Sequence, residues 1–478
     1  MNGYVQELKA SVDRQTVLYT LLGAVIAILA GFVIAQWGLK GVGVLLAIPV
    51  TGVLVAVCLY QPKLGLFIYV QLSFLVNGIS RFSPVQAPFG MLADGLLVLI
   101  LLGVLLNARQ LDWGRLHNPV FYLVLLWFLY TLLELFNPEA IYPMAWVYGV
   151  RLMSFYWIQL TLLTMLLIRT KKDINQLINL WLIWSVLAAL WAFKQRYIGL
   201  TWGEQAWLDE GASITHVLFG HLRCFSFYSD AGQFGVEMAY AALLCVIKVL
   251  EDRSVTRKIV FLLIGIIVFW GYALSGTRGA LFVFIVGFPV YLLLRRNLLI
   301  LSVGVIIAGC GFGLLKYTSV GSSLYDINRM RSALNPEESS LQVRLDNQKK
   351  LAEYLATRPF GCGLGSSSDL AKRFTPGSFL AETPPDSWYV KVWTETGIVG
   401  LVLHVGTLLF FLVVGGYKTM RLTDPELQSL LLSLLCGYVG VLVASYGNPV
   451  FGQFPTNSIM SISIVLLCTG GFVERKDV

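Results

Sequence analysis

Long apolar runs with few polar residues inside them dominate the pattern of the chain. About 20 apolar residues are enough to cross roughly 30 Å of hydrocarbon as a helix. The runs are continuous, whereas the strands of a membrane barrel would alternate between polar and apolar positions. The pattern therefore predicts an all-α polytopic membrane protein with about 12 to 14 transmembrane helices. The candidate spans are residues 17–37, 41–60, 62–78, 88–107, 119–136, 146–168, 175–193, 233–250, 259–275, 277–294, 298–315, 387–415, 427–446 and 456–473.

The composition agrees with this prediction. The chain has 478 residues, of which 57% are hydrophobic and 13% are charged, and its mean hydropathy is +0.73. These values exclude a soluble globular protein of ordinary composition. The first apolar run begins near Val17 and has no small-residue cleavage site after it, so we expect a retained span there rather than a signal peptide.

The Lys and Arg residues predict how the helices are oriented. If the N-terminus lies in the cytoplasm, the inner connections and the two termini hold 18 of the 35 Lys and Arg residues. The short outer connections near 138–145 and 443–456 hold none, as the positive-inside rule expects. We therefore expect both termini in the cytoplasm. The chain then divides into N-terminal spans 1–174, core spans 175–316 with an outer loop at 194–233, a large and partly helical outer loop 317–386, and the last three spans in 387–478.

Eight basic residues oppose this orientation, because they lie in or beside the membrane on the outer side. One of them, Arg278, stands in ALSGTRGALF, a break of a few residues between two apolar runs. A guanidinium keeps its proton, so near a bilayer it needs water, an anion or a partner. We expect several of the eight to have a use on the outer face. They are Lys40, Arg81, Arg151, Lys194, Arg196, Arg223, Arg278 and Lys391.

A helix is predicted in the large outer loop. The sequence NPEESS from residue 335 offers a cap, a proline at the first helical position and acids in the first turn. The helix should end before Pro359. Arg344 lies beside its apolar face, and two interpretations stay open for this residue: a solvated interfacial charge or a ligand-binding cation. The predicted apolar face consists of Leu341, Leu345, Ala352 and Leu355.

The next span opens with TPPDSWYVKVWTETGIVG, which begins at residue 383. Asp386 can cap the helix that follows, so one interpretation gives it no further role. Lys391 and Glu395 are four residues apart, which favours an ion pair on the helix surface.

Four short motifs follow one another along the chain. They are RCFSFYSDAGQFG with Arg223, LSGTRGAL with Arg278, Arg344 ahead of RPFGCGLG, and DSWYVKVWTETGIVGL. This series resembles the O-antigen ligase and Wzy-type O-antigen (exopolysaccharide) polymerase superfamily, over roughly residues 175–415. Each motif is short, but the order, the spacing and the shared outer location make the combination specific. The resemblance implies a multi-spanning transferase with a large periplasmic loop near its C-terminal end.

The resemblance also implies a substrate and a site. The protein would be a glycosyltransferase that moves or polymerises a glycan carried on undecaprenyl pyrophosphate, at the periplasmic face of the bacterial inner membrane. Arg223, Arg278 and Arg344 would converge on one cavity and bind the pyrophosphate, because arginine forks match phosphate oxygens and stay charged. They would stabilise the charge that grows on the leaving group. The expected partners are the lipid-linked oligosaccharide, a glycan, lipid or protein acceptor, and membrane lipids, but no nucleic acid.

Two features of the outer loops bear on the chemistry. The loops hold no DxD-like acidic cluster, so we expect neither a metal nor another cofactor. The family's usual His is Asp386 here and its Asn is Ser387, while Tyr389 keeps its place. Either Asp386 takes over the catalytic role that the resemblance gives to this His, or the chain belongs to a branch with another acceptor. Nearby arginines should lower the pKa of Asp386 and make it a weak base.

Further candidates and alternatives stay open. Asp230, Ser387, Tyr389 and Arg151 are secondary site candidates, and His216 and His221 are other possible bases in the outer loop. A transporter or flippase of anionic or lipid-linked solutes would use outer arginines in a vestibule, but the internal repeat common in transporters is not visible. A non-catalytic scaffold would leave the arginines unexplained. Ligase and polymerase differ in their acceptor, which the sequence alone does not identify.

Overall fold

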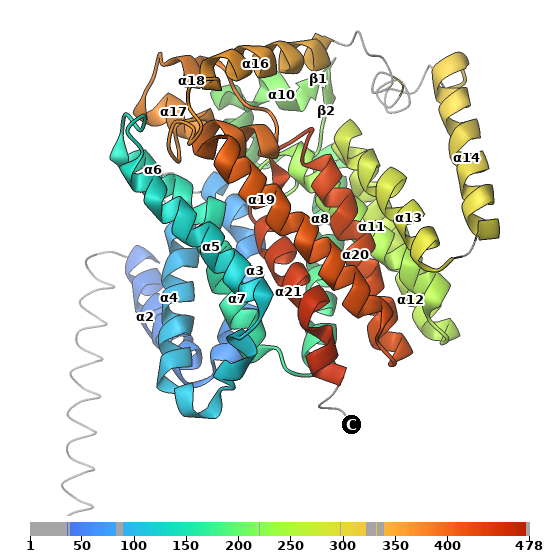
Figure 1. The fold of residues 1–478 in the computed structure, drawn as a ribbon, viewed down its shortest axis with the longest axis horizontal. Helices are drawn as coiled ribbons and strands as arrows, with labels where there is room; N and C mark the ends of the chain where they lie inside the picture. The colour runs from blue at the N-terminus through green and yellow to red at the C-terminus, as the bar shows by residue number, and fades with distance from the viewer. Residues whose placement is uncertain are drawn as a thin grey trace, which may run out of the picture. The chain divides into compact units, whose positions relative to one another are not determined.

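The computed structural model describes residues 39–82, 89–218, 220–296, 298–321 and 339–474, together with the single residues 36 and 331. Helices make up nearly all the regular structure in these ranges (Figure 1). The strands described are β1 (Val217–Leu218) and β2 (His221–Leu222), which pair antiparallel. The predicted all-α class is confirmed.

Eight of the described helices are long and apolar enough to cross a membrane, and five shorter apolar helices accompany them. Together they match thirteen of the fourteen predicted runs. The run at 17–37 lies outside the described residues except for position 36. The polytopic character of the protein is therefore confirmed from the length and composition of its helices. The eight long ones are Pro62–Phe82, Pro119–Phe136, Pro143–Leu167, Lys171–Tyr197, Ala231–Glu251, Val255–Ser275, Trp388–Met420 and Pro425–Ala444.

The labels of Figure 1 follow the chain. The larger helices are α2 (Leu39–Tyr60), α3 (Pro62–Phe82), α4 (Gly90–Leu106), α5 (Pro119–Leu133), α7 (Tyr156–Leu167), α8 (Lys171–Tyr197), α11 (Ala231–Glu251), α12 (Val255–Ser275), α13 (Leu281–Leu294), α14 (Leu298–Tyr317), α16 (Ser339–Leu355), α19 (Trp388–Met420), α20 (Pro425–Ala444) and α21 (Thr456–Glu474). The short ones are α6 (Pro143–Val150), α9 (Trp202–Trp207), α10 (Ser213–His216), α17 (Ser368–Phe374) and α18 (Phe379–Glu382). A π-helical stretch, Arg151–Phe155, joins α6 to α7, and a 3-10 turn, Arg278–Ala280, leads into α13.

The chain forms two compact units. The first comprises Met1–Gly65 and Leu99–Asn107, and the second comprises Leu66–Val98 and Ala108–Val478. Within the first unit the amide of Asn107 donates to the carbonyl of Leu59 over 2.9 Å, which ties the end of α4 to α2. The four-part division of the chain made from the sequence stays a prediction.

Helix α11 is the buried centre of the second unit. It packs against α12, α20 and α13, which lie beside it in Figure 1. Small residues allow the close approach that is typical of helices in membranes. A Cβ on Gly437 would lie 2.1 Å from the ring of Tyr240, and one on Gly287 would lie 2.6 Å from the carbonyl oxygen of Cys436. One end of this bundle holds the start of α11, the end of α12, the start of α13 and the end of α20. We call it the site end.

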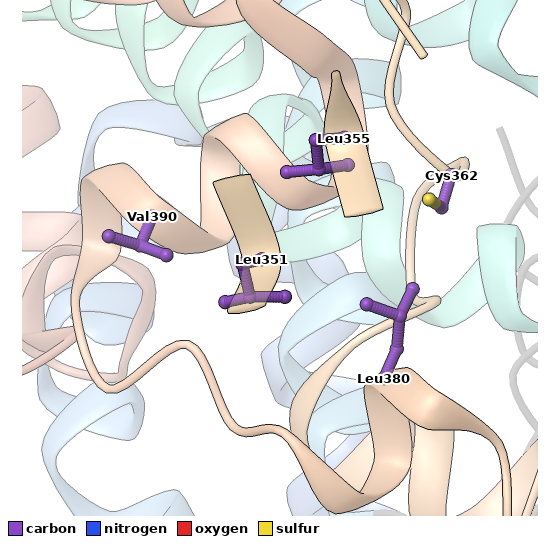
Figure 2. Close-up of a cluster of buried hydrophobic side chains, with 5 residues drawn as sticks. All are labelled: Leu351, Leu355, Cys362, Leu380 and Val390. Carbon is purple, nitrogen blue, oxygen red and sulfur yellow. The ribbon is translucent and has the colours of Figure 1, made fainter. Parts of the chain in front are cut away.

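At the site end α16, α17, α18 and the segment 358–367 form a small lobe, the α16 lobe, which rests on the start of α19 (Figure 1). A buried apolar cluster holds it there (Figure 2). Its members are Leu351, Leu355, Cys362, Leu380 and Val390.

The predicted apolar face of this helix is only partly right. Leu355 is buried, but Leu341 and Leu345 are 36% and 37% exposed, and Ala352 is exposed as well. Leu351 takes the buried place, because only the C-terminal half of α16 lies on the cluster. The predicted end before Pro359 is confirmed, whereas the predicted start at residue 335 lies outside the described residues.

Helix α19 is broken at Gly397, where φ is +67°. A Cβ on Gly397 would lie 2.0 Å from the carbonyl oxygen of Pro359, so only glycine lets the segment 358–367 dock on the break. This docking changes the predicted pair beside it. Lys391 and Glu395 do form an ion pair of 3.1 Å, but Glu395 is buried rather than on the surface, because the docked segment covers it and Ser367 donates to its carboxylate over 2.6 Å.

Candidate functional site

Arg223 lies against the turn that carries Arg278. Its Nη2 donates to the hydroxyl of Thr277 over 3.1 Å, and its Nη1 donates to the carbonyl of Thr215 over 2.9 Å. Thr277 directly precedes Arg278, which opens the 3-10 turn between α12 and α13. Both arginines are half-buried. The structure thus brings together two residues that are 55 positions apart in the sequence.

The first turn of α11 forms the floor beside these arginines. Asp230 is its N-cap, and one carboxylate oxygen accepts from the backbone N–H of Gln233 over 2.9 Å. The other oxygen accepts from the side-chain amide of Gln453 over 2.9 Å and lies 3.1 Å from the hydroxyl of Ser229. Asp230, a secondary candidate from the sequence, therefore holds the start of the helix and joins it to the loop before α21.

His216 also serves the start of α11. Its Nε2 accepts from the backbone N–H of Ala231 over 3.1 Å, which requires the neutral form of the ring. Burial lowers the pKa of His216 to about 4. The carbonyl of Ala231 in turn accepts from the hydroxyl of Thr277 over 2.7 Å. His216, the start of α11 and Thr277 are thus connected, and Thr277 directly precedes Arg278.

The loop after α20 connects this floor to Arg344. A Cβ on Gly232 would lie 1.7 Å from the side-chain amide nitrogen of Asn448, so the loop contacts α11 closely. One residue earlier, Gly447 faces α16: the Nη1 of Arg344 lies 4.0 Å from the position that a Cβ would take on Gly447. Arg344 is thus placed at the same loop as the first turn of α11.

Asp386 is the acidic neighbour of Arg344. The Arg344 Nε and an oxygen of Asp386 are 4.0 Å apart, and the two side chains are 41% and 42% exposed. Burial raises the pKa of Asp386 above its ordinary value, and the charges of Arg344 and Lys372 oppose this rise without cancelling it. The expectation of a lowered pKa is therefore wrong. The single arginine contact is too long to outweigh the loss of water around the carboxylate.

The residues that follow Asp386 have different surroundings. Ser387, not Asp386, is the N-cap residue of α19, and no side chain makes a capping hydrogen bond there. The hydroxyl of Ser387 is buried and has no hydrogen-bond partner among the described residues. The hydroxyl of Tyr389 donates to the carbonyl of Leu442 over 2.8 Å, which joins α19 to α20. Tyr389 therefore has a packing role in this structure.

Arg151, the other secondary candidate, contacts residues outside this group. It forms an ion pair of 2.7 Å with Asp94 and donates to the hydroxyl of Tyr156 over 3.0 Å. Its described contacts join α4 to the α6–α7 region and do not reach the other three arginines.

Some residues of the site were not found from the sequence. Thr277 and Gln453 are uncharged polar residues, so their roles leave no local signal in the sequence. Arg81 had a signal, because it opposes the predicted orientation. It donates to the carbonyls of Ser226 and Ser229 over 2.9 Å and 3.0 Å, and so holds the loop before α11.

One pocket lies apart from these arginines, since none of them lines it. It has a volume of about 40 Å³ and lies in the α16 lobe, between residues 139–145, 362–366 and 375–380 and the ring of Tyr354. Within the ranges that the structure describes, no group of three or more His, Cys, Asp or Glu side chains is placed to hold a metal ion. We call Arg223, Arg278, Arg344, Asp386 and the first turn of α11 together the α11 site.

The fold and this site define a multi-pass, all-α membrane protein with arginines and a carboxylate around one end of its central helix. Residues 259–405 match the family model of the O-antigen ligase domain, Wzy_C. An O-antigen polymerase from Salmonella muenchen is 22% identical over 219 residues, which cover 44% of this chain and 51% of that protein. The chain thus matches about half the length of this relative. The resemblance to the O-antigen ligase and polymerase superfamily is confirmed.

Proposed function

We propose that the protein is a membrane glycosyltransferase of the O-antigen ligase or polymerase type. It moves or polymerises a glycan carried on undecaprenyl pyrophosphate, at the periplasmic face of the inner membrane, with both termini in the cytoplasm. The observation that carries the proposal is the α11 site, in which Arg223 lies against the Arg278 turn and Arg344 lies beside Asp386. The family match supports the reaction class.

The arginines act on the leaving group. A hydroxyl of the acceptor attacks the anomeric carbon, a new glycosidic bond forms, and the bond to the pyrophosphate oxygen breaks. Negative charge grows on the pyrophosphate as this bond breaks. Fixed guanidinium groups stabilise that charge where water is scarce, and they match phosphate oxygens in pairs. Because the positive charge comes from these residues, we propose that the reaction needs no metal.

Asp386 takes the proton of the attacking hydroxyl. A carboxylate whose pKa is raised by burial is a stronger base than an ordinary Asp, and the structure gives Asp386 such a pKa. Arg344 holds this carboxylate near the loop after α20, beside the first turn of α11. The acceptor is a glycan in a polymerase and a lipid or protein in other members of the reaction class, and the same arrangement serves each.

The activity is tested with purified protein in lipid vesicles, supplied with undecaprenyl-pyrophosphate-linked oligosaccharide and candidate acceptors. We expect a longer glycan or a glycosylated acceptor, together with released undecaprenyl pyrophosphate. Arg253→Ala is a matched control, because this exposed arginine lies at the opposite end of α11 and α12. Transfer of the intact substrate across the vesicle membrane without a new glycosidic bond would contradict the proposal and favour a flippase.

The orientation has its own test. Cys310 is exposed and the other described cysteines are buried, so Cys310→Ser gives a background for labelling. Asp346→Cys on α16 should react with a membrane-impermeant thiol reagent from the periplasmic side, and Arg253→Cys only from the cytoplasmic side. The reverse pattern would place the α11 site on the wrong face for this substrate.

A further inference from the structure

Glu237 is a buried carboxyl that the mechanism above does not use. It lies in α11, within a helix that is apolar and long enough to cross a membrane, and it has no exposed surface. One of its oxygens accepts from the hydroxyl of Thr456, at the start of α21, over 2.9 Å. An ionisable residue in such surroundings is costly to bury, so its presence calls for a function.

A ladder of hydrogen bonds leads from Glu237 to the first turn of α11. Gln233 lies one turn earlier on the helix and is also fully buried. Its Nε2 donates to the Thr456 hydroxyl over 3.0 Å, and its Oε1 accepts from the backbone N–H of Ser229 over 3.1 Å. The ladder therefore links α11, α21 and the loop before α11.

The direction of each bond from the Ser229 backbone N–H to Glu237 is fixed. A backbone N–H can only donate, so Ser229 fixes which end of the Gln233 amide faces the loop. The amide nitrogen must then donate to Thr456, and the Thr456 hydroxyl must use its own proton on Glu237. An acceptor at position 237 completes the ladder. Without one, the proton of the Thr456 hydroxyl has no acceptor in the ladder.

The upper end of the ladder is the α11 site. The backbone N–H of Gln233 donates to Asp230, which also accepts from Gln453. The next residue, Ala231, accepts from Thr277 through its carbonyl. Thr277 in turn accepts from Arg223. Hydrogen bonds, together with the peptide backbone between Asp230 and Ala231, thus connect a carboxyl inside the bundle to an arginine of the site.

We propose that Glu237 is a positioning residue of the α11 site. Through Thr456 and Gln233 it fixes the first turn of α11, and with that turn it fixes Thr277 and Arg223. The catalytic part of this proposal rests on the proposed function, because a small displacement of Arg223 matters only if Arg223 binds the leaving group. The structural part does not depend on it.

The test compares variants of the full-length protein in lipid vesicles. Glu237→Leu and Thr456→Val each break the ladder, whereas Glu237→Gln keeps an acceptor for Thr456. Tyr240→Phe is the matched control, because Tyr240 lies three residues further along α11 and donates a buried hydrogen bond to Leu434 that does not reach the first turn. Hydrogen exchange of the amides 229–236 reports the structure, and kcat and KM for the lipid-linked oligosaccharide report the reaction.

We expect faster exchange of these amides in Glu237→Leu and Thr456→Val, with kcat lowered roughly tenfold or more and KM changed less. The two changes together should cost no more than either alone, since both remove the same link. Glu237→Gln should keep most of the protection and most of kcat, and Tyr240→Phe should lower the melting temperature without affecting either readout.

Three results would overturn the proposal. They are unchanged exchange in both ladder variants, an equal loss in Tyr240→Phe, and a Glu237→Gln variant as impaired as Glu237→Leu. If the wild-type protein transfers no glycan but the exchange pattern is as expected, the ladder stands and the proposed function fails.

Discussion

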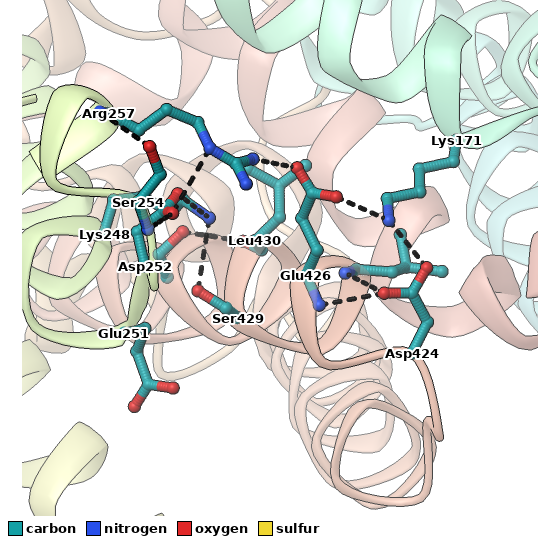
Figure 3. A network of polar contacts seen from close by, with 12 residues as sticks. Lys171, Lys248, Glu251, Asp252, Ser254, Arg257, Asp424, Glu426, Ser429 and Leu430 are labelled. Carbon is teal, nitrogen blue, oxygen red and sulfur yellow. Dashed lines mark hydrogen bonds and ion pairs between the residues drawn. The ribbon is translucent and has the colours of Figure 1, made fainter. Parts of the chain in front are cut away.

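Charged side chains at the two ends of the central bundle have different kinds of partners. At the end opposite the α11 site, acids and bases from α8, α11, α12 and α20 bind one another (Figure 3). Lys171 reaches both Asp424 and Glu426 over 2.7 Å, and Arg257 reaches Glu426 and Asp252. We call this group the ion-pair end.

The hydrogen bonds of Arg223 and Arg81 at the site end are of another kind. Arg223 is held by a carbonyl and a hydroxyl, and Arg81 by backbone carbonyls. Arg344 lies 4.0 Å from its acidic neighbour Asp386. Neutral oxygens position a guanidinium without cancelling its charge, whereas the ion-pair end binds charge to charge. In the proposed function the site end binds an anionic ligand, and we infer that the ion-pair end serves stability.

The largest effect is expected for Arg278. Arg278→Ala and Arg278→Lys should each lower glycan transfer by about 10²-fold to 10³-fold, because a point charge cannot replace a planar fork on a pyrophosphate. Expression and melting temperature should stay close to those of the wild type. The measurement is the rate of release of undecaprenyl pyrophosphate. Full activity in Arg278→Lys would mean that only charge balance matters at this position.

Asp386→Asn should lower turnover by about 10²-fold if Asp386 is the base. The amide keeps the shape and removes the negative charge. A base must be deprotonated, and the pKa of Asp386 is raised, so the wild-type rate should fall with decreasing pH already above the range of an ordinary Asp. Arg344→Gln removes a charge that opposes this rise and should move the fall to still higher pH. An unchanged pH profile in Arg344→Gln would show that Arg344 does not influence the protonation of Asp386.

Asp252→Asn addresses the buried part of the ion-pair end. Asp252 is 3% exposed and forms ion pairs with Lys248, which is 5% exposed, over 3.8 Å, and with Arg257 over 3.3 Å. Removing the acid leaves a buried lysine without its carboxylate, which should cost about 2 kcal/mol of stability. This lies below the usual cost of breaking a deeply buried pair, because the half-exposed Arg257 brings water close. A thermal melt should show the loss, and turnover at low temperature should not change.

Glu426→Gln should have the smallest effect. Its side chain is 39% exposed, and exposed ion pairs are worth about 0.5 to 1 kcal/mol. The melting temperature should fall slightly and the fall should shrink at high salt, because salt screens exposed charges. A loss of glycan transfer in this variant would contradict the division of roles between the two ends.

The sequence predicted the helices well, and the reason is physical. A segment that crosses hydrocarbon must satisfy its own backbone hydrogen bonds, so a continuous apolar run of sufficient length becomes a helix whatever its neighbours are. The run at 427–446 is an example, since it corresponds closely to α20 (Pro425–Ala444). The position of Arg278 in a short break was also visible, because the cost of a charge beside a bilayer is local.

Tertiary packing decided the rest. The sign of the pKa shift of Asp386 depends on how much water the α16 lobe leaves around it, and the burial of Glu395 depends on a segment that docks at Gly397. The link from Glu237 through Thr456 to Gln233 joins residues up to 223 positions apart. Such contacts depend on which helices lie side by side, and no local pattern of apolar and polar residues encodes that choice. The sequence alone therefore determined the helices and the arginines of this protein, and only the packed structure decided which groups hold those arginines in place.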